Sequence, residues 1–92
     1  MMMIVTAYCH CALCCGEAGM PTASGVMPRP GITIAAPRRL PFGTRVYIHG
    51  LGWRTVQDRT HRRYDGRLDV FVRNHNAAKK FGKKRLPCEF TP

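Results

Sequence analysis

Two aspartates, Asp58 and Asp69, are the residues of this chain best suited to do chemistry. They are two of only five acidic residues among 92, whereas Lys and Arg together number fifteen. Asp58 closes a segment rich in β-branched and aromatic residues, and Asp69 lies inside a second segment with alternating apolar residues, so both are predicted on strands. Where two such carboxylates lie close together, each raises the pKa of the other and favours a protonated acid.

A structural ion pair is the competing interpretation of Asp69. The candidate partners are the arginines that lie close to it in sequence, namely Arg62, Arg63, Arg67 and Arg73. Perturbed carboxylates occur both in functional sites and in structural ion pairs, so the sequence leaves the two interpretations open.

The charge of the chain predicts a polyanionic partner. A net charge of +10 and an isoelectric point near 10.2 suit nucleic acid, an anionic membrane surface or an acidic cell-wall polymer. The chain lacks a basic and aromatic ribonucleoprotein motif, which counts against nucleic acid. It also lacks a run of roughly 18 apolar residues, so no membrane span is predicted.

The elements that must position the two aspartates are short strands of a single domain covering residues 1–92. A hydrophobic fraction of 45% with nine glycines and seven prolines is typical of a folded, turn-rich domain. The predicted strands are residues 3–8, 32–35, 44–48, 53–57, 68–72 and 86–90, and Pro87 marks the last as an edge strand. One helix is predicted over residues 74–81, with Asn74 or Asn76 at its start and Gly82 at its end. Six short strands and one short helix predict a small all-β barrel.

A cysteine-rich segment, CHCALCC, forms the second group of residues with chemical potential. Its thiols are Cys9, Cys11, Cys14 and Cys15, with His10 among them. Thiolates at this spacing suit a structural zinc site, although a second pair of ligands at metal-binding spacing is missing. A disulfide to Cys88 competes equally with zinc, and packed free thiols are the third interpretation. In the first two cases the segment is expected to stabilise the fold rather than to catalyse.

Several motifs occur in an order that resembles one known family. TAYC near the N-terminus is followed by CCG, by TASG at residues 22–25, by LPFGTRVYI at residues 40–48, by GLGWRTVQD at residues 50–58 and by LDVF at residues 68–71. This order is similar to that of the 3D (three-aspartate) domain, a small double-psi β-barrel related to the barrel of membrane-bound lytic transglycosylase A. Such domains occur in resuscitation-promoting and stationary-phase survival proteins. The resemblance spans residues 5–90 and implies a six-stranded double-psi β-barrel.

The three aspartates that name the family match this chain only in part. The second and third correspond to Asp58 and Asp69, whereas Ala36 stands where the first is expected. Arg38 and Arg39 follow, and they are expected to make that wall of the groove positive and to lower the pKa of a nearby acid. The sequence leaves open whether the loss of the first aspartate abolishes activity.

The resemblance implies a lytic transglycosylase acting on peptidoglycan without a catalytic cofactor. Such an enzyme cleaves the β-1,4 bond between N-acetylmuramic acid (MurNAc) and N-acetylglucosamine (GlcNAc) and leaves a 1,6-anhydromuramyl product. Asp69 would then be the acid and base and Asp58 its supporting partner. Ser24 and Thr44 would position sugar hydroxyls and Trp53 would stack on a sugar ring, unless these three serve as turn and core residues. The alternative is a non-catalytic barrel that binds cell-wall glycan or another polyanion.

The implied activity predicts a location in the cell envelope or outside the cell. The apolar segment 1–7 lacks the basic start and the length of a secretory signal, and it predicts the first strand instead. We therefore expect export by other means, either within a longer exported protein or with the help of phage products that open the membrane.

Overall fold

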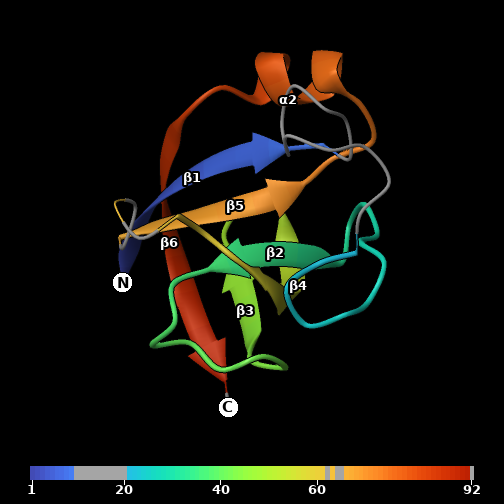
Figure 1. Ribbon diagram of the computed structural model, residues 1–92. Helices are drawn as coiled ribbons and strands as arrows, with labels where there is room; N and C mark the ends of the chain where they lie inside the picture. Colours follow the sequence, from blue (N-terminus) through green and yellow to red (C-terminus); the bar gives the residue numbers. More distant parts are fainter. Residues whose placement is uncertain (10–20, 62, 64–65, 92) are drawn as a thin grey trace.

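Six strands form a closed barrel in the computed structural model, which describes residues 1–9, 21–61, 63 and 66–91 (Figure 1). The elements are β1 (Met2–Tyr8), β2 (Thr33–Ala36), β3 (Arg45–Ile48), β4 (Gly52–Arg59), β5 (Arg67–Phe71), α2 (His75–Phe81) and β6 (Lys84–Thr91). Around the barrel the strand order is β1-β5-β2-β4-β3-β6. The predicted all-β barrel with one short helix is therefore confirmed.

The barrel mixes parallel and antiparallel pairs. β1 pairs with β5 and β2 with β4 in parallel, and the other four neighbouring pairs are antiparallel. The strand order places β2 between β5 and β4, although these three strands come from separate parts of the chain. This order brings the strands that carry Asp58 and Asp69 to either side of β2.

The last strand, β6, is not an edge strand, contrary to the prediction based on Pro87. β6 pairs with β1 on one side and with β3 on the other, which closes the barrel. Pro87 is tolerated because a proline lacks only the donor of its ladder position and keeps the carbonyl. That carbonyl accepts a hydrogen bond from His49 N at 3.0 Å.

Apolar side chains that alternate along the strands fill the barrel. The fully buried members of the core are Val5, Ile34, Ala36, Val46, Ile48, Val56 and Leu68. Complete burial of one such side chain is worth roughly 1.5–3 kcal/mol, so this core is the main source of stability. A second, separate cluster contains Tyr8, Ala35 and Phe71. Because successive residues of a strand point to opposite faces, this second cluster lies on the outer face of the barrel.

The helix α2 begins and ends as predicted. The Asn74 side-chain oxygen accepts a hydrogen bond from Ala77 N at 2.9 Å, which satisfies one of the free donors at the helix start. Gly82 follows the last turn with a φ of 68°, a conformation that favours glycine. α2 packs against β1, so it covers one end of the strand that carries Tyr8.

Candidate functional site

The two aspartates occupy one row of residues that crosses four neighbouring strands. Ala35 of β2 is in register with Asp58 of β4 on one side and with Asp69 of β5 on the other. Asp69 is in turn in register with Thr6 of β1. Residues in register across a sheet share one face, so both carboxylates lie on the outer face with only the small Ala35 between them. Two strand spacings separate their backbones, or about 10 Å.

A change of register in β4 places Asp58 on this face. Ile34 pairs with Val56, and both side chains belong to the core, but the next residue, Ala35, pairs with Asp58. The register therefore skips Gln57, as in a β-bulge. With strict alternation, Asp58 would point into the barrel as Val56 does, because residues two apart on a strand share a face. The extra residue turns the carboxylate outward instead.

The Asp58 carboxylate is held by three donors from three parts of the chain. The Tyr8 hydroxyl donates to Oδ2 at 3.1 Å, while the backbone N–H groups of Ala23 and Arg59 each donate to Oδ1 at 2.9 Å. Tyr8 reaches this carboxylate from β1, on the far side of β5 and β2. Hydrogen bonds to a carboxylate are roughly twice as strong as neutral ones, so these three donors fix the Asp58 side chain in place.

Asp69 is the aspartate whose acidity is changed most clearly. Burial raises the pKa of Asp69 from 3.8 to about 6, because the charged form loses solvation. The hydrogen bond that Thr6 Oγ1 donates to Asp69 Oδ1 at 3.0 Å, together with the charge of Arg67, opposes this rise in pKa. The negative charge of Asp58 adds to it. A carboxyl group with this pKa is half protonated near pH 6 and can both donate and accept a proton.

The direction of this pKa shift bears on the ion-pair interpretation of Asp69. A dominant ion pair with arginine lowers the pKa of a carboxyl group. Here Arg67 has that effect on Asp69, but burial outweighs it, so the net pKa rises. Arg67 therefore acts on Asp69 without forming a dominant ion pair with it. The effect expected from Arg38 and Arg39 stays a prediction.

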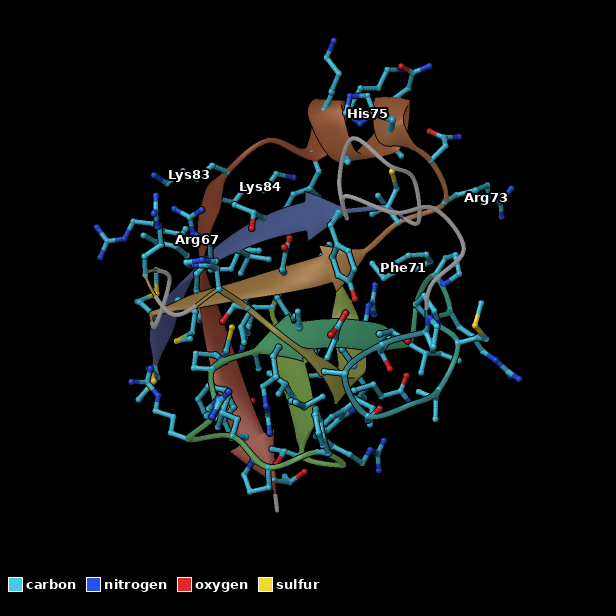
Figure 2. All side chains as sticks on the ribbon, viewed as in Figure 1. Arg67, Phe71, Arg73, His75, Lys83 and Lys84 are labelled. Atoms are coloured by element: carbon cyan, nitrogen blue, oxygen red, sulfur yellow. The ribbon has the colours of Figure 1, made fainter. Side chains whose placement is uncertain are left out.

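Two aromatic rings border the row of carboxylates. Tyr8 and Phe71 are in register on β1 and β5, and their rings meet edge to face with centroids 5.3 Å apart. Both side chains are buried, and they pack with Ala35 on the outer face (Figure 2 labels Phe71). Sequence reasoning missed Thr6 and Tyr8 as site residues. Their signal was the period of two along β1, which puts residues 6 and 8 on one face of the strand.

Of the three residues predicted to bind sugar, Ser24 alone lies beside the carboxylates. Its neighbour Ala23 donates to Asp58, and its own hydroxyl is 3.1 Å from Thr22 Oγ1 in an exposed turn. Thr44 is buried in the turn before β3, where its N–H donates to Pro41 O and its carbonyl accepts from Val56 N. That position gives Thr44 the role of a turn residue.

Trp53 lies at the opposite end of β4 from Asp58. They are five positions apart, which is roughly 17 Å along a strand. The Trp53 ring packs edge to face with Tyr47 and lies under the guanidinium of Arg45, 4.8 Å from the ring centroid. The indole is 45% exposed, so it is accessible to a ligand, but one sugar ring cannot contact both Trp53 and the two aspartates.

Ala36 does not line the row of carboxylates, contrary to the prediction for the first family position. Its side chain is fully buried and belongs to the central core with Ile34 and Val70. Ala35, one residue earlier, occupies the place between Asp58 and Asp69. The reason is strand alternation, because neighbouring residues of β2 face opposite sides of the barrel wall.

The predicted cysteine cluster falls largely outside the described residues. This applies to Cys11, Cys14 and Cys15, whereas Cys9 is described and buried at the end of β1. Cys88 is a buried free thiol, and burial raises its pKa. Within residues 1–9, 21–61, 63 and 66–91, no three His, Cys, Asp or Glu side chains come together as metal ligands. The zinc and disulfide interpretations of the segment stay predictions.

Comparison with known proteins leaves the family resemblance as a hypothesis. No family model matches the sequence, and no curated protein matches it. In the part of the chain that the structure describes, no helix is long and apolar enough to span a membrane.

Proposed function

We propose that this barrel is a lytic transglycosylase that cleaves the MurNAc–GlcNAc β-1,4 bond of peptidoglycan and leaves 1,6-anhydromuramyl products. The observation that carries the proposal is a half-buried acid, Asp69, with a pKa of about 6 on the same outer face as a second, firmly held carboxylate, Asp58. The order of motifs that resembles the 3D domain supports the same assignment. The activity would place the protein in the cell envelope or outside the cell.

One carboxyl group is enough for both proton transfers of this reaction. Protonated Asp69 donates its proton to the glycosidic oxygen as the bond from that oxygen to the anomeric carbon of MurNAc breaks. The resulting Asp69 carboxylate then accepts the proton of the C6 hydroxyl of the same sugar, whose oxygen bonds to the anomeric carbon. The proton given at the first step is recovered at the second, and no water enters the product.

Asp58 has an electrostatic role in this scheme. Its negative charge helps to raise the pKa of Asp69 and so keeps more of that acid protonated. The same charge lies on the face where positive charge develops on the sugar ring in the transition state, which it would stabilise. Tyr8 positions Asp58 through the hydrogen bond to Oδ2, and Thr6 positions Asp69 through the hydrogen bond to Oδ1.

Digestion of purified peptidoglycan, followed by mass spectrometry of the soluble products, tests this function. We expect 1,6-anhydromuramyl products from the wild-type protein and a loss of about 10²–10⁴-fold in rate for Asp69→Asn. Asp58→Asn should be slower than wild type but retain more activity than Asp69→Asn. Glu89→Gln is the matched control, since Glu89 is an exposed carboxylate on β6 whose side chain is 71% accessible. Full activity of Asp69→Asn with loss of activity in Asp58→Asn would reverse the assigned roles.

A non-catalytic glycan-binding or polyanion-binding barrel is the second candidate function, and one observation favours it. Arg67 of β5 and Arg85 of β6 are both in register with Ile4 of β1, two residues before Thr6. This places two cations on the same outer face as Asp69. Figure 2 shows Arg67, Lys83 and Lys84 on the side of the barrel where β1, β5 and β6 meet.

Such a face would hold an anionic polymer whether or not the bond is cut. Co-sedimentation with insoluble peptidoglycan tests the binding function, and binding should weaken with added salt because the contacts are ionic. If the wild-type protein sediments with the polymer but releases no anhydro product at any pH between 4 and 8, the binding function replaces the catalytic one.

A further inference from the structure

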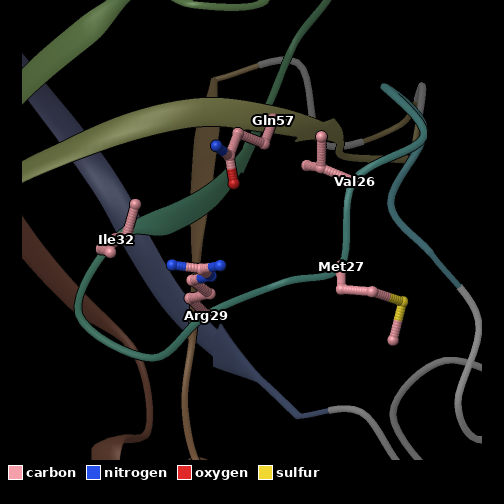
Figure 3. Close-up of a pocket in the computed structure, with 5 residues that line it drawn as sticks. All are labelled: Val26, Met27, Arg29, Ile32 and Gln57. Atoms are coloured by element: carbon pink, nitrogen blue, oxygen red, sulfur yellow. The ribbon is translucent and has the colours of Figure 1, made fainter.

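A pocket of about 450 Å³ opens beside Gln57, the residue that precedes Asp58 (Figure 3). Its lining residues come from the segment before β2 and from β4, and they are Val26, Met27, Arg29, Ile32 and Gln57. Gln57 immediately precedes Asp58, and the chain that forms the opposite wall begins at the turn from which Ala23 donates to Asp58. Both walls of the pocket are therefore connected through the chain to residues that contact or adjoin Asp58.

Three of the five lining residues are apolar and exposed to solvent. Val26 is 42% exposed, Met27 53% and Ile32 43%. Exposed apolar residues that line a concavity, in contrast to scattered ones, are typical of a ligand site. A ligand for this pocket should therefore carry short aliphatic groups.

The polar groups of the pocket favour an anion. Figure 3 shows the Arg29 guanidinium and the Gln57 amide pointing toward one another across the pocket. Thr33, which is fully buried, accepts a hydrogen bond from Arg29 N at 2.9 Å and donates one to Gln57 Oε1 at 2.6 Å. Because Thr33 engages the Gln57 oxygen, the amide nitrogen is the part of that side chain left to donate. A guanidinium and an amide N–H together suit a carboxylate.

We propose that this pocket binds the peptide stem attached to MurNAc, so that the protein recognises stem-bearing glycan strands. The inference rests on the proposed function, because it takes peptidoglycan as the polymer in the site. The stem offers the chemistry that the pocket requires, since it combines methyl-bearing alanine residues with free carboxylates. Arg29 pairs with a stem carboxylate, and Val26, Met27 and Ile32 contact its aliphatic groups.

Titration with a soluble stem peptide tests the pocket independently of bond cleavage. The probe is the free stem tetrapeptide, followed in NMR spectra through the Gln57 side-chain amide and the Ile32 methyl groups, and a version with amidated carboxylates serves as the ligand control. We expect saturable binding, with roughly tenfold weaker affinity after amidation and after Arg29→Gln, because each change removes one charged hydrogen bond at an accessible site. Arg38→Gln is the matched protein control, since Arg38 is an exposed arginine beyond the end of β2.

A second measurement compares cleavage of stem-bearing glycan with cleavage of peptide-free glycan. Arg29→Gln should raise KM about tenfold for the stem-bearing polymer, with kcat retained, and should leave the peptide-free polymer unaffected. Anhydro products without any binding of the stem peptide would overturn the pocket assignment and leave the catalytic function standing. Saturable stem binding without anhydro products would overturn the catalytic function and leave the pocket assignment standing. Equal weakening by Arg29→Gln and Arg38→Gln would show general charge attraction and would overturn the pocket assignment.

Discussion

Replacement of Asp69 by asparagine should stabilise the protein at neutral pH. Burial raises the pKa of Asp69 from 3.8 to about 6, so the folded chain binds this proton more tightly than the unfolded chain does. The contribution of Asp69 to stability is therefore most favourable below pH 4 and declines as the pH rises to about 6. A shift of about two pKa units corresponds to roughly 3 kcal/mol, which is the upper limit of the gain in the free energy of unfolding.

Denaturant unfolding of the wild-type protein and of Asp69→Asn from pH 4 to pH 8 measures this effect. The difference in unfolding free energy should grow by up to roughly 1.4 kcal/mol per pH unit between pH 4 and 6 and should level off above pH 7. Asparagine keeps an oxygen that can accept the Thr6 hydrogen bond. Any other cost of the substitution in unfolding free energy is the same at every pH, so it does not change the pH dependence of the difference. Glu89→Gln, which removes an exposed carboxylate of β6, is the matched control. A difference for Asp69→Asn that stays constant from pH 4 to 8 would refute the raised pKa.

Two further substitutions and one deletion test the geometry of the site. Tyr8→Phe removes the donor to Asp58 Oδ2 and should cost about 1 kcal/mol of stability and lower the rate of anhydro-product release; an unchanged rate would exclude a positioning role for Tyr8. Ala36→Asp places a carboxylate in the core and should destabilise the fold by roughly 3 kcal/mol or more in denaturant unfolding. A stable and more active variant would instead show that position 36 lies beside the two aspartates. Deletion of Gln57 should remove the bulge and leave Asp58 paired with Ala35 on the outer face, so the variant should still unfold cooperatively in thermal denaturation; loss of cooperative folding would contradict the bulge.

The strand positions could be predicted from the sequence because the alternation of apolar residues and the turn residues are local features of the chain. The predicted segments at residues 3–8 and 68–72 correspond closely to β1 and β5, and the helix boundaries followed from Asn74 and Gly82. The prediction that the last strand is an edge strand was wrong. Pro87 indicates only that one backbone N–H is missing, and it does not indicate how many strands pair with β6. Barrel closure depends on pairing with β1 and β3, which lie far away in sequence.

The relative positions of the site residues were harder to predict from the sequence than the strands that carry them. The bulge at Gln57 adds one residue without a distinctive composition, yet it decides which way Asp58 points. For the same reason Ala35, rather than Ala36, separates the two aspartates. Trp53 has the exposure of a sugar-stacking residue, but its distance from Asp58 follows from strand length and register, which residue type alone does not reveal.

Digestion of peptidoglycan by the wild-type protein in heavy-oxygen water, with mass analysis of the released muropeptides, distinguishes transglycosylation from hydrolysis. If Asp69 performs both proton transfers, the MurNAc ends should be 1,6-anhydro, lighter by one water than hydrolysed ends, and free of heavy oxygen. The rate should follow protonation of a group with a pKa of about 6 and fall as the pH rises above it. Reducing MurNAc ends that carry heavy oxygen would show hydrolysis by an activated water and would contradict the assigned reaction.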